Sequence, residues 1–348
     1  MQSRSRAEEY HVADATDVDL PSWDAFLQGR SEAVAHQLSG WRHVLADASG
    51  VRPASWIARD PHGAIAGVLA TYLSRSRFTG VHLATMEGGA VARNHIVSTV
   101  LFGAAMQRAR EWKAQYLLVR GGFAPGAPTR TMCLARHVVD LDNGSAGVWR
   151  TLASDRRRKV RLAERAGVEI VRDDGALKAW YALYARRMKE LGTPVESRSF
   201  FDAMRRHLGD AFCLLAARRE ARLVAGMICL RMPGRWTYAY GARDTRDRVH
   251  ANDLLFWRAI ETAALAGARL LDLGASMAGS GADTYKRRWG QRTENVEYAF
   301  YPVGGSSIPR GLDTYRGQRS VPQRIWARMP GILASHLGPR LRRQLPFA

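Results

Sequence analysis

Apolar and polar positions along this chain repeat one series of predicted elements twice. Residues 55–73 alternate into a turn at Asp60-Pro61-His62-Gly63 and out again, which is typical of a β-hairpin, and residues 213–230 do the same. Laid over each other without a gap, Ala58-Arg59 meets Ala217-Arg218 and Ala66-Gly67 meets Ala225-Gly226. The pattern predicts two related hairpins, with chance matching of short Ala-Gly pairs as the alternative.

Each hairpin is followed by further β-like sequence, a helix and a short apolar strand that ends in glycine. In the first half we expect the helix at 95–113 and the strand at 116–120, and in the second half the helix at 253–266 and the strand at 270–273. The same order occurring twice predicts a duplicated α/β unit, with mixed sheets flanked by helices.

A basic helix is predicted between the two halves. Ser154-Asp155 can cap it, Gly167 ends it, and arginines crowd one of its faces, among them Arg157, Arg158 and Arg161. Val160 and Ala163 offer the opposite side for packing. Either this face is simply solvated, or it binds an anionic ligand.

Two apolar stripes and one polar connection follow. Leu177, Tyr181, Tyr184, Met188 and Leu191 lie on one side of a helix over 174–191, and a shorter helix over 199–208 turns its phenylalanines inward, so both stripes indicate core. After a strand at 236–240 comes the polar stretch 241–252. We expect Asn252 or Asp253 to cap the next helix, whose first amides otherwise suit an anion.

The segment 269–290, RLLDLGASMAGSGADTYKRRWG, combines an apolar strand, a glycine-rich loop and a basic cluster. Glycine carries no Cβ and tolerates positive φ, so the loop can bring its backbone close to a ligand. Lys286, Arg287 and Arg288 supply charge for an anionic substrate or a developing oxyanion. The alternative is an ordinary surface loop with a basic rim.

Composition narrows the class of protein. The 348 residues, 46% of them hydrophobic, can bury large cores, and 52 Lys+Arg against 32 Asp+Glu give a net charge of +20 that favours anionic partners. The three cysteines have unrelated spacings, and no metal-binding motif occurs, so we expect no metal. Without a secretory signal or a long apolar stretch, a cytoplasmic protein is expected.

The second half resembles the FemAB-like family, acyltransferases built from tandem GNAT-type domains and related to the BioF2-like acetyltransferases. The resemblance covers roughly residues 20–305. It is densest in RRRKVRLAERAGVEI, LYARRMKELGTPVESRSFF, YAYGARDTRDRVHANDLLFWRAI and LDLGASMAGSGADTYKRRWG. It implies a first GNAT-like domain at 1–150, a catalytic second at 151–305, and a basic amphipathic tail at 306–348. Within the family, the chain looks most like the group encoded with bacterial exopolysaccharide and protein-sorting (PEP-CTERM) systems.

The resemblance implies transfer of an acyl or aminoacyl group to an amine, without a covalent enzyme intermediate. Well-studied relatives move amino acids from aminoacyl-tRNA to a peptidoglycan precursor, and the lysine implicated in their catalysis matches Lys286 of the Tyr285-Lys286 pair. A fixed ammonium stabilises the negative charge that builds on the carbonyl oxygen, although it can also simply hold a substrate phosphate. Asp272 is the nearest candidate base, or a buried structural acid. Further substrate-binding candidates are Tyr240, Asn252, Trp257, Ser276 and Ser280.

The donor stays open. No coiled-coil arm of the kind some tRNA-dependent members carry is visible, and the place of the coenzyme A pyrophosphate loop reads RDRVHAND. Aminoacyl-tRNA, acyl carrier protein and acyl-coenzyme A are all anionic candidates. Three hypotheses follow: a FemAB-like enzyme acting on an envelope or exopolysaccharide precursor, a coenzyme A-dependent N-acyltransferase acting on a small amine, and a non-catalytic RNA-binding protein, which the scarcity of interleaved aromatic platforms disfavours. The absence of a Gly-x-Ser-x-Gly elbow argues against a hydrolase.

The tail 306–348 mixes arginines with apolar residues in short helical pieces that Pro330 and Pro339 are expected to interrupt. This pattern suits peripheral association with the inner face of the cytoplasmic membrane or with a partner protein. The alternative is packing of the tail on its own domain.

Overall fold

The computed structural model describes residues 9–309 and 321–344, which form two compact units. Of these residues, unit 1 holds 9–133, 296–309 and 343–344, and unit 2 holds 134–295 and 321–342. The strand segment after residue 295 thus returns to the first unit, and 134–150 go with the second. The domain boundaries expected from sequence, at 150 and 305, stay a proposal.

Unit 1 is a mixed sheet with the order β1-β2-β3-β4-β6-β13, in which β4 and β6 are parallel and β5 pairs with β3. Buried apolar side chains of β2, β3, β6 and α4 form its core. Its strands are β1 (His11–Asp14), β2 (Arg52–Arg59), β3 (Ile65–Ser76), β4 (Gly80–Thr85), β5 (Val91–Ala92), β6 (Tyr116–Arg120) and the later part of β13 (Arg292–Pro302). Its helices are η1 (Asp17–Asp19), α2 (Leu20–Gln28), η2 (Ala35–Gln37), α3 (Trp41–Val44), η3 (Leu45–Ser49) and α4 (His95–Glu111).

Unit 2 is built on the order β7-β12-β11-β10-β9-β8, antiparallel except for the parallel pair β11 and β12. Its strands are β7 (Arg130–Asp140, of which 134–140 belong to this unit), β8 (Glu169–Arg172), β9 (Phe212–Arg219), β10 (Arg222–Met232), β11 (Arg235–Arg243) and β12 (Leu270–Ser276). Its helices are α5 (Gly144–Thr151), α6 (Ser154–Arg165), η4 (Asp174–Ala176), α7 (Leu177–Leu191), α8 (Arg198–Leu208), η5 (Gly209–Ala211), α9 (Ala251–Leu265), α10 (Gly281–Arg287), α11 (Val321–Arg328) and α12 (Gly331–Arg342).

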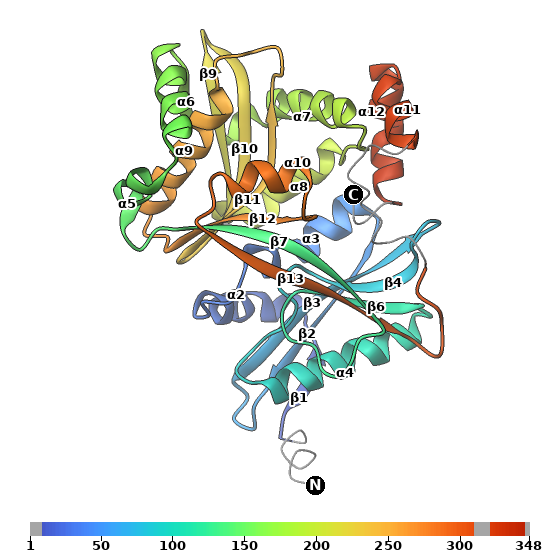
Figure 1. Cartoon of the computed structure of the whole chain (residues 1–348). Coiled ribbons are helices and arrows are strands. Elements are labelled where there is room, and N and C mark those ends of the chain that lie inside the picture. Colours follow the sequence, from blue (N-terminus) through green and yellow to red (C-terminus); the bar gives the residue numbers. More distant parts are fainter. Residues whose placement is uncertain (1–8, 310–320, 345–348) are drawn as a thin grey trace. The chain divides into compact units, whose positions relative to one another are not determined.

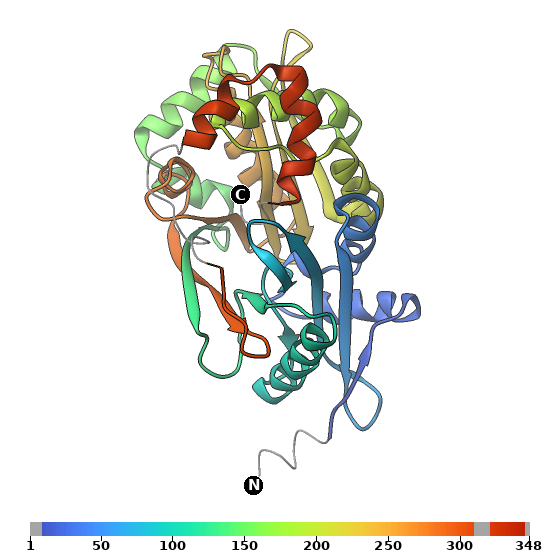
Figure 2. The same cartoon turned by 90° about the vertical axis from the view of Figure 1, so that its right-hand side faces the viewer.

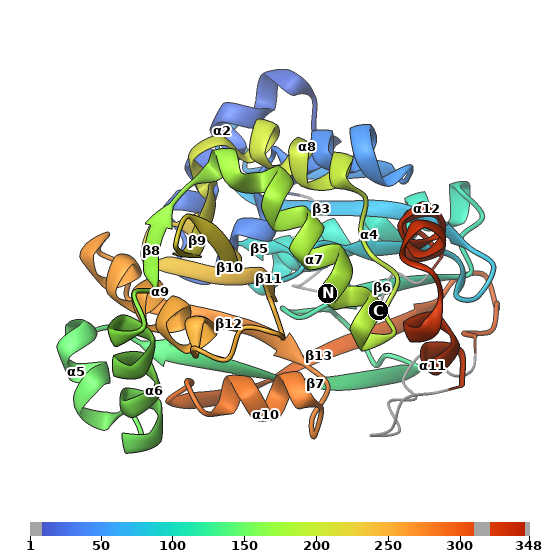
Figure 3. The same cartoon turned by 90° about the horizontal axis from the view of Figure 1, so that it is seen from above.

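The helices of unit 2 cover both faces of its strands. Alternate residues of β9, such as Cys213 and Leu215, join α6 and α9 in one core. On the other face Trp180 of α7 donates a hydrogen bond from its indole nitrogen to the carbonyl of Gly226 at 3.1 Å. Figure 3 shows α7 and α9 on opposite sides of the strands. The elements expected from sequence at 154–167, 174–191 and 199–208 are therefore present, each burying one face.

The predicted duplication is confirmed in element order. Both units contain a hairpin, a further strand, a helix and a strand parallel to that further strand, in this order (Figure 1). The elements are β2-β3-β4-α4-β6 in unit 1 and β9-β10-β11-α9-β12 in unit 2. The ungapped match does not extend to strand register: Ala58 pairs with Gly67, whereas Ala217 pairs with Ala225. The second hairpin closes through Glu220 and Ala221, both with positive φ, which is a tighter turn than the one around Asp60–Gly63.

Three local expectations need correction. Ala153, not Ser154, is the N-cap residue of α6, because the helix already begins at Ser154. The buried face of α7 consists of Leu177, Trp180, Leu183 and Tyr184, so only part of the predicted stripe points inward. Neither Asn252 nor Asp253 caps α9: His250 occupies the N-cap position in the left-handed conformation, and both side chains have other partners.

The tail contains two helices that contact α7 within unit 2 (Figure 2). Pro330 separates α11 from α12 as expected, but Pro339 lies inside α12 and does not interrupt it. The tail residues 310–320 and 345–348 lie outside the described part. Within the described residues, no helix combines the length and apolarity needed to cross a bilayer.

Candidate active site

The central feature of unit 2 is the point at which the parallel strands β11 and β12 stop pairing. Their ladder ends at Thr237 and Asp272, and on its other side β12 has an irregular register with β7 between Asp272 and Ala275. Gly274 lies in this bulge with a φ of +76°, and a Cβ there would stand 3.3 Å from the carbonyl oxygen of Tyr238 and 3.4 Å from Nζ of Lys286. Glycine at this position lets an amine approach the backbone.

Helix α10 carries that amine to the strand end. Ser280 caps the helix by accepting a hydrogen bond from the Asp283 amide at 3.1 Å, and α10 contacts β12 (Figure 3). Nζ of Lys286 donates to the carbonyl of Gly274 at 3.1 Å, to the carbonyl of Ala275 at 3.4 Å and to Oγ of Ser276 at 2.9 Å. The ammonium is thereby held in one position.

Two opposing effects set the pKa of the Lys286 amine. Burial lowers the pKa of its amine from 10.5 to about 8, while the carboxylates of Asp272 and Asp283 oppose this change. The group is therefore still mainly an ammonium at neutral pH. It can stabilise negative charge there, yet it releases its proton near the upper end of the physiological range.

Asp272 is tied into the strand framework. Its Oδ2 accepts from Arg235 at 2.7 Å and lies 3.5 Å from Nε of Arg136, and its Oδ1 accepts from the Gly274 amide at 2.7 Å. The side chain is 3% exposed. Of the two roles expected from sequence, these contacts fit the buried structural acid, which also favours the charged form of Lys286.

Tyr285, on the same helix, turns toward α9. Its hydroxyl accepts a hydrogen bond from Nδ2 of Asn252 at 2.6 Å, and burial, with the nearby Asp253 carboxylate, raises its pKa. Arg156 of α6 lies 6.0 Å from the centre of the Tyr285 ring and forms a buried ion pair with Asp253. The structure thus brings Lys286, Tyr285, Asn252, Ser276 and Asp272 into one neighbourhood.

A second buried pair holds α10 from the side of β7. Nε2 of His137 lies 2.7 Å from Oδ1 of Asp283, and Nδ1 lies 3.0 Å from Oγ1 of Thr293. The hydrogen bond from His137 lowers the pKa of Asp283, and the second oxygen of that carboxylate accepts from the Gly279 amide at 2.9 Å. His137 therefore fixes both the glycine loop and the first turn of α10.

Replacing His137 with alanine is expected to raise the pKa of Lys286 by about one pH unit, because a loosened α10 exposes the amine to water. The measurement is the pH dependence of labelling of Lys286 by an amine-reactive reagent, read by peptide mass spectrometry. Thr293→Ala, which retains the pair between His137 and Asp283, is the matched control. An unchanged labelling midpoint in His137→Ala would contradict this positioning role.

The remaining candidates in unit 2 have other partners or face solvent. Nη1 of Arg157 donates to three carbonyls at the end of α5, at 2.8–3.2 Å, and Arg158 is 64% exposed and paired with Asp155. Arg161 lies over the Trp149 ring, which in turn packs against the buried Trp257. Tyr240 packs against Tyr184, Phe200 and Phe201. Ser280 is the cap described above, and Arg287 and Arg288 are exposed.

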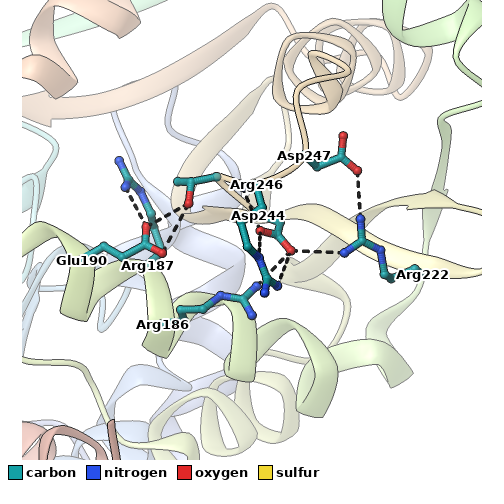
Figure 4. Close-up of polar contacts among 8 residues, drawn as sticks. Arg186, Arg187, Glu190, Arg222, Asp244, Arg246 and Asp247 are labelled. Carbon is teal, nitrogen blue, oxygen red and sulfur yellow. Dashed lines mark hydrogen bonds and ion pairs between the residues drawn. The ribbon is translucent and has the colours of Figure 1, made fainter. Parts of the chain in front are cut away.

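An arginine network surrounds Asp244, in the connection between β11 and α9 (Figure 4). This carboxyl is 3% exposed, and Arg186, Arg222 and Arg246 lie 2.9–3.4 Å from it. The hydrogen bond from Arg246 is the main reason that its pKa lies far below the usual range. The three arginine side chains remain 43–69% exposed, so one buried acid orients three accessible cations.

Sequence reasoning missed Arg156 and His137. Arg156 lies four residues before Val160 and seven before Ala163, so helical spacing places it on the same inward face as these two residues. His137 had no such signal, because Asp283 and Thr293 are far from it in sequence. In residues 9–309 and 321–344, no group of three potential metal ligands gathers.

Comparison with known proteins defines the class of fold. Residues 150–287 match the family model of the acetyltransferase (GNAT) domain, which includes the site around Lys286. The whole chain has no significant match among curated proteins. Unit 2 therefore contains a GNAT-type domain.

Solved structures extend this fold over most of the chain. FemX is 14% identical with a TM-score of 0.65, and the match covers 84% of this chain and 97% of FemX. L-PGS from Bacillus licheniformis is 14% identical with a TM-score of 0.55, covering 94% and 98%. A tandem GNAT protein from the clavulanic acid biosynthesis pathway is 14% identical with a TM-score of 0.52, covering 86% and 100%. These likenesses confirm the tandem GNAT-like α/β fold expected from sequence.

Proposed function

We propose that this chain is an acyltransferase that moves an acyl or aminoacyl group from an activated anionic donor to an amine by direct attack. The observation that carries the proposal is the Lys286 ammonium, held beside Ser276 at the bulged end of β12 in a GNAT-type domain. The acceptor is proposed to be a cell-envelope or exopolysaccharide precursor, as the sequence resemblance to the exopolysaccharide-associated FemAB group suggests.

Ser276 is proposed to connect the Lys286 ammonium to the reacting group through hydrogen bonds. Its Oγ accepts a hydrogen bond from Lys286, so its own O–H proton is directed to another acceptor. When the amine attacks the donor carbonyl, the developing oxyanion receives this hydrogen bond and the positive field of Lys286. Asp272 contributes by favouring the charged amine.

The acceptor amine bonds to the carbonyl carbon, and the bond from that carbon to the ester or thioester leaving group breaks. The amine proton passes to solvent or to the leaving group. Because Asp272 is held by Arg235 and Arg136, the proposal assigns it no proton transfer.

Charge supports an anionic donor. Arg287 and Arg288 follow Lys286 on the surface, and the arginines around Asp244 are fixed in orientation but accessible. The beginning of α9 is less suited to a pyrophosphate, because the Asp253 carboxylate lies in its first turn. This favours acyl carrier protein or aminoacyl-tRNA over acyl-coenzyme A.

A conventional coenzyme A-dependent N-acyltransferase acting on a small amine is the second candidate. The family model matched by residues 150–287 describes an acetyltransferase, which favours this alternative. Both candidates use the same Lys286 chemistry and differ in donor and acceptor.

Thermal-shift measurements with acyl-coenzyme A, acyl carrier protein and aminoacyl-tRNA are expected to identify one donor by the rise in melting temperature it causes.

With that donor, Arg246→Glu is expected to reduce affinity by about tenfold, because the reversed charge repels an anion. Arg269→Glu, at an exposed arginine outside the Asp244 network, is the matched control. If no donor stabilises the protein and none is consumed in the presence of amines, the proposed function is wrong.

A further inference from the structure

The two tail helices have an inward face that is firmly packed on unit 2. Trp326 and Ala334 are 7% and 5% exposed, and Nζ of Lys189 on α7 donates to the Ala327 carbonyl at 3.2 Å. Gly192, at the end of α7, lies so close to the carbonyl of Gln323 that no side chain fits there. Helices α11 and α12 are therefore a fixed part of unit 2.

Arg342 anchors the end of α12. Its Nε lies 2.6 Å from Oε1 of Glu196, in the loop between α7 and α8, and only 17% of the side chain is exposed. The Glu196 carboxylate opposes the effect of burial and raises the pKa of Arg342. This buried ion pair defines which side of α12 faces the protein.

Both tail helices also carry apolar side chains that are exposed. Ile325 is 62% exposed, and Leu333 and Leu337, one helical turn apart, are 52% and 38% exposed. Arg340 continues the line of Leu333 and Leu337 along α12, and Arg328 lies three residues after Ile325 on α11; both arginines are exposed. We call Ile325, Arg328, Leu333, Leu337 and Arg340 the tail face.

The charge of the two tail helices indicates which kind of partner the tail face binds. Residues 321–344 contain five arginines, of which Arg342 is paired with Glu196, and no aspartate or glutamate. Exposed leucine and isoleucine interleaved with cations, with no acid among them, are the features of a helix that lies on an anionic bilayer. A protein partner would require its own acidic and apolar surface, whereas the bilayer offers both along its whole extent.

We infer that the tail face docks unit 2 on the surface of an anionic lipid bilayer. The apolar side chains enter the boundary between headgroups and acyl chains, and Arg328 and Arg340 contact lipid phosphates. Of the two possibilities left by the sequence, the structure shows packing of the helices on the domain, and the inference assigns membrane association to their exposed side chains.

The test is cosedimentation of the full-length chain with vesicles of phosphatidylcholine, with or without phosphatidylglycerol. Wild-type protein is expected to bind only the phosphatidylglycerol vesicles, and added salt is expected to weaken binding. Leu333→Ser with Leu337→Ser, and separately Arg328→Glu with Arg340→Glu, are each expected to lower the bound fraction at least about fivefold.

Leu265→Ser combined with Arg269→Glu is the matched control, because Leu265 is 89% exposed and the Arg269 side chain is 77% exposed away from the tail. This variant is expected to bind as the wild type does, and thermal melting checks that every variant is folded. Equal binding by all variants, or no binding by the wild type, would overturn the inference. A wild-type dimer that dissociates on the leucine substitutions, without vesicle binding, would also overturn it.

Discussion

Replacing Lys286 with methionine is expected to lower turnover by at least about a hundredfold, because the oxyanion loses the ammonium and the Ser276 hydrogen bond that it orients. The same substitution is expected to raise the free energy of unfolding at pH 7 by about 1–3 kcal/mol, because it removes a buried charge. Turnover is measured with the donor identified by thermal shift, and stability by denaturant unfolding.

The lowered pKa of Lys286 also predicts the direction in which stability and turnover change with pH. The folded-state pKa of Lys286 is about 8 and its ordinary value is 10.5, so the unfolded chain binds more protons between these values. Wild-type stability should therefore rise through this range, and the advantage of Lys286→Met should shrink. Turnover that depends on the ammonium should fall as the pH rises through about 8.

Lys178→Met is the matched control, because Lys178 is exposed on α7. It is expected to change neither turnover nor the pH dependence of stability. Full activity of Lys286→Met would remove this amine from the chemistry. Loss of activity together with loss of stability would instead assign Lys286 a structural role.

Replacing Arg156 with methionine is expected to destabilise the protein by about 3–5 kcal/mol, because the Asp253 carboxylate loses its buried partner. The side chain of Arg156 is 4% exposed and that of Asp253 10%, so water screens the pair poorly. Denaturant unfolding measures the loss. Turnover is expected to fall as well, since Arg156 and Asp253 flank Tyr285.

Arg158→Met on the same helix is the control, because its side chain is 64% exposed and its partner Asp155 also has other cations nearby. The expected change there is within about 0.5 kcal/mol. Adding Asp253→Asn to Arg156→Met should recover most of the lost stability, because no uncompensated charge remains. Equal losses in Arg156→Met and Arg158→Met would contradict the special position of Arg156.

Sequence predicted part of the candidate site for local reasons. The order of strand, glycine loop and Tyr285-Lys286 is contiguous, so the short helix that follows the loop brings Lys286 back to Gly274 and Ser276. The arginines of α6 were predictable only in part: spacing from Val160 places Arg156 inward, but its partner Asp253 is 97 residues away in the sequence and gives no local signal. Arg156 is the buried one, and Arg157, Arg158 and Arg161 serve α5, solvent and Trp149.

Contacts between residues that lie far apart in the sequence could not be predicted, because no local pattern indicates them. His137 reaches Asp283 only because β7 pairs with β12 and α10 contacts that strand. For Asp272 the sequence left two roles open, a base and a buried structural acid, and the contacts with Arg235 and Arg136 from two neighbouring strands fit the second. Tyr240 lies among the aromatic rings of α7 and α8 through a packing that periodicity does not specify.

By itself, the sequence determined the duplicated series of elements, the mixed α/β fold and the basic glycine-loop segment around Lys286, because alternation, helical spacing and glycine act over a few residues. Only the tertiary structure decided which charges are buried and paired. The free energy of an ionisable group depends on the dielectric and the partners around it, which come from distant segments. For this reason the pKa of Lys286 and the partners of Asp272 could be read only from the folded structure. The same holds for the buried and exposed sides of α11 and α12, because they depend on packing against distant segments.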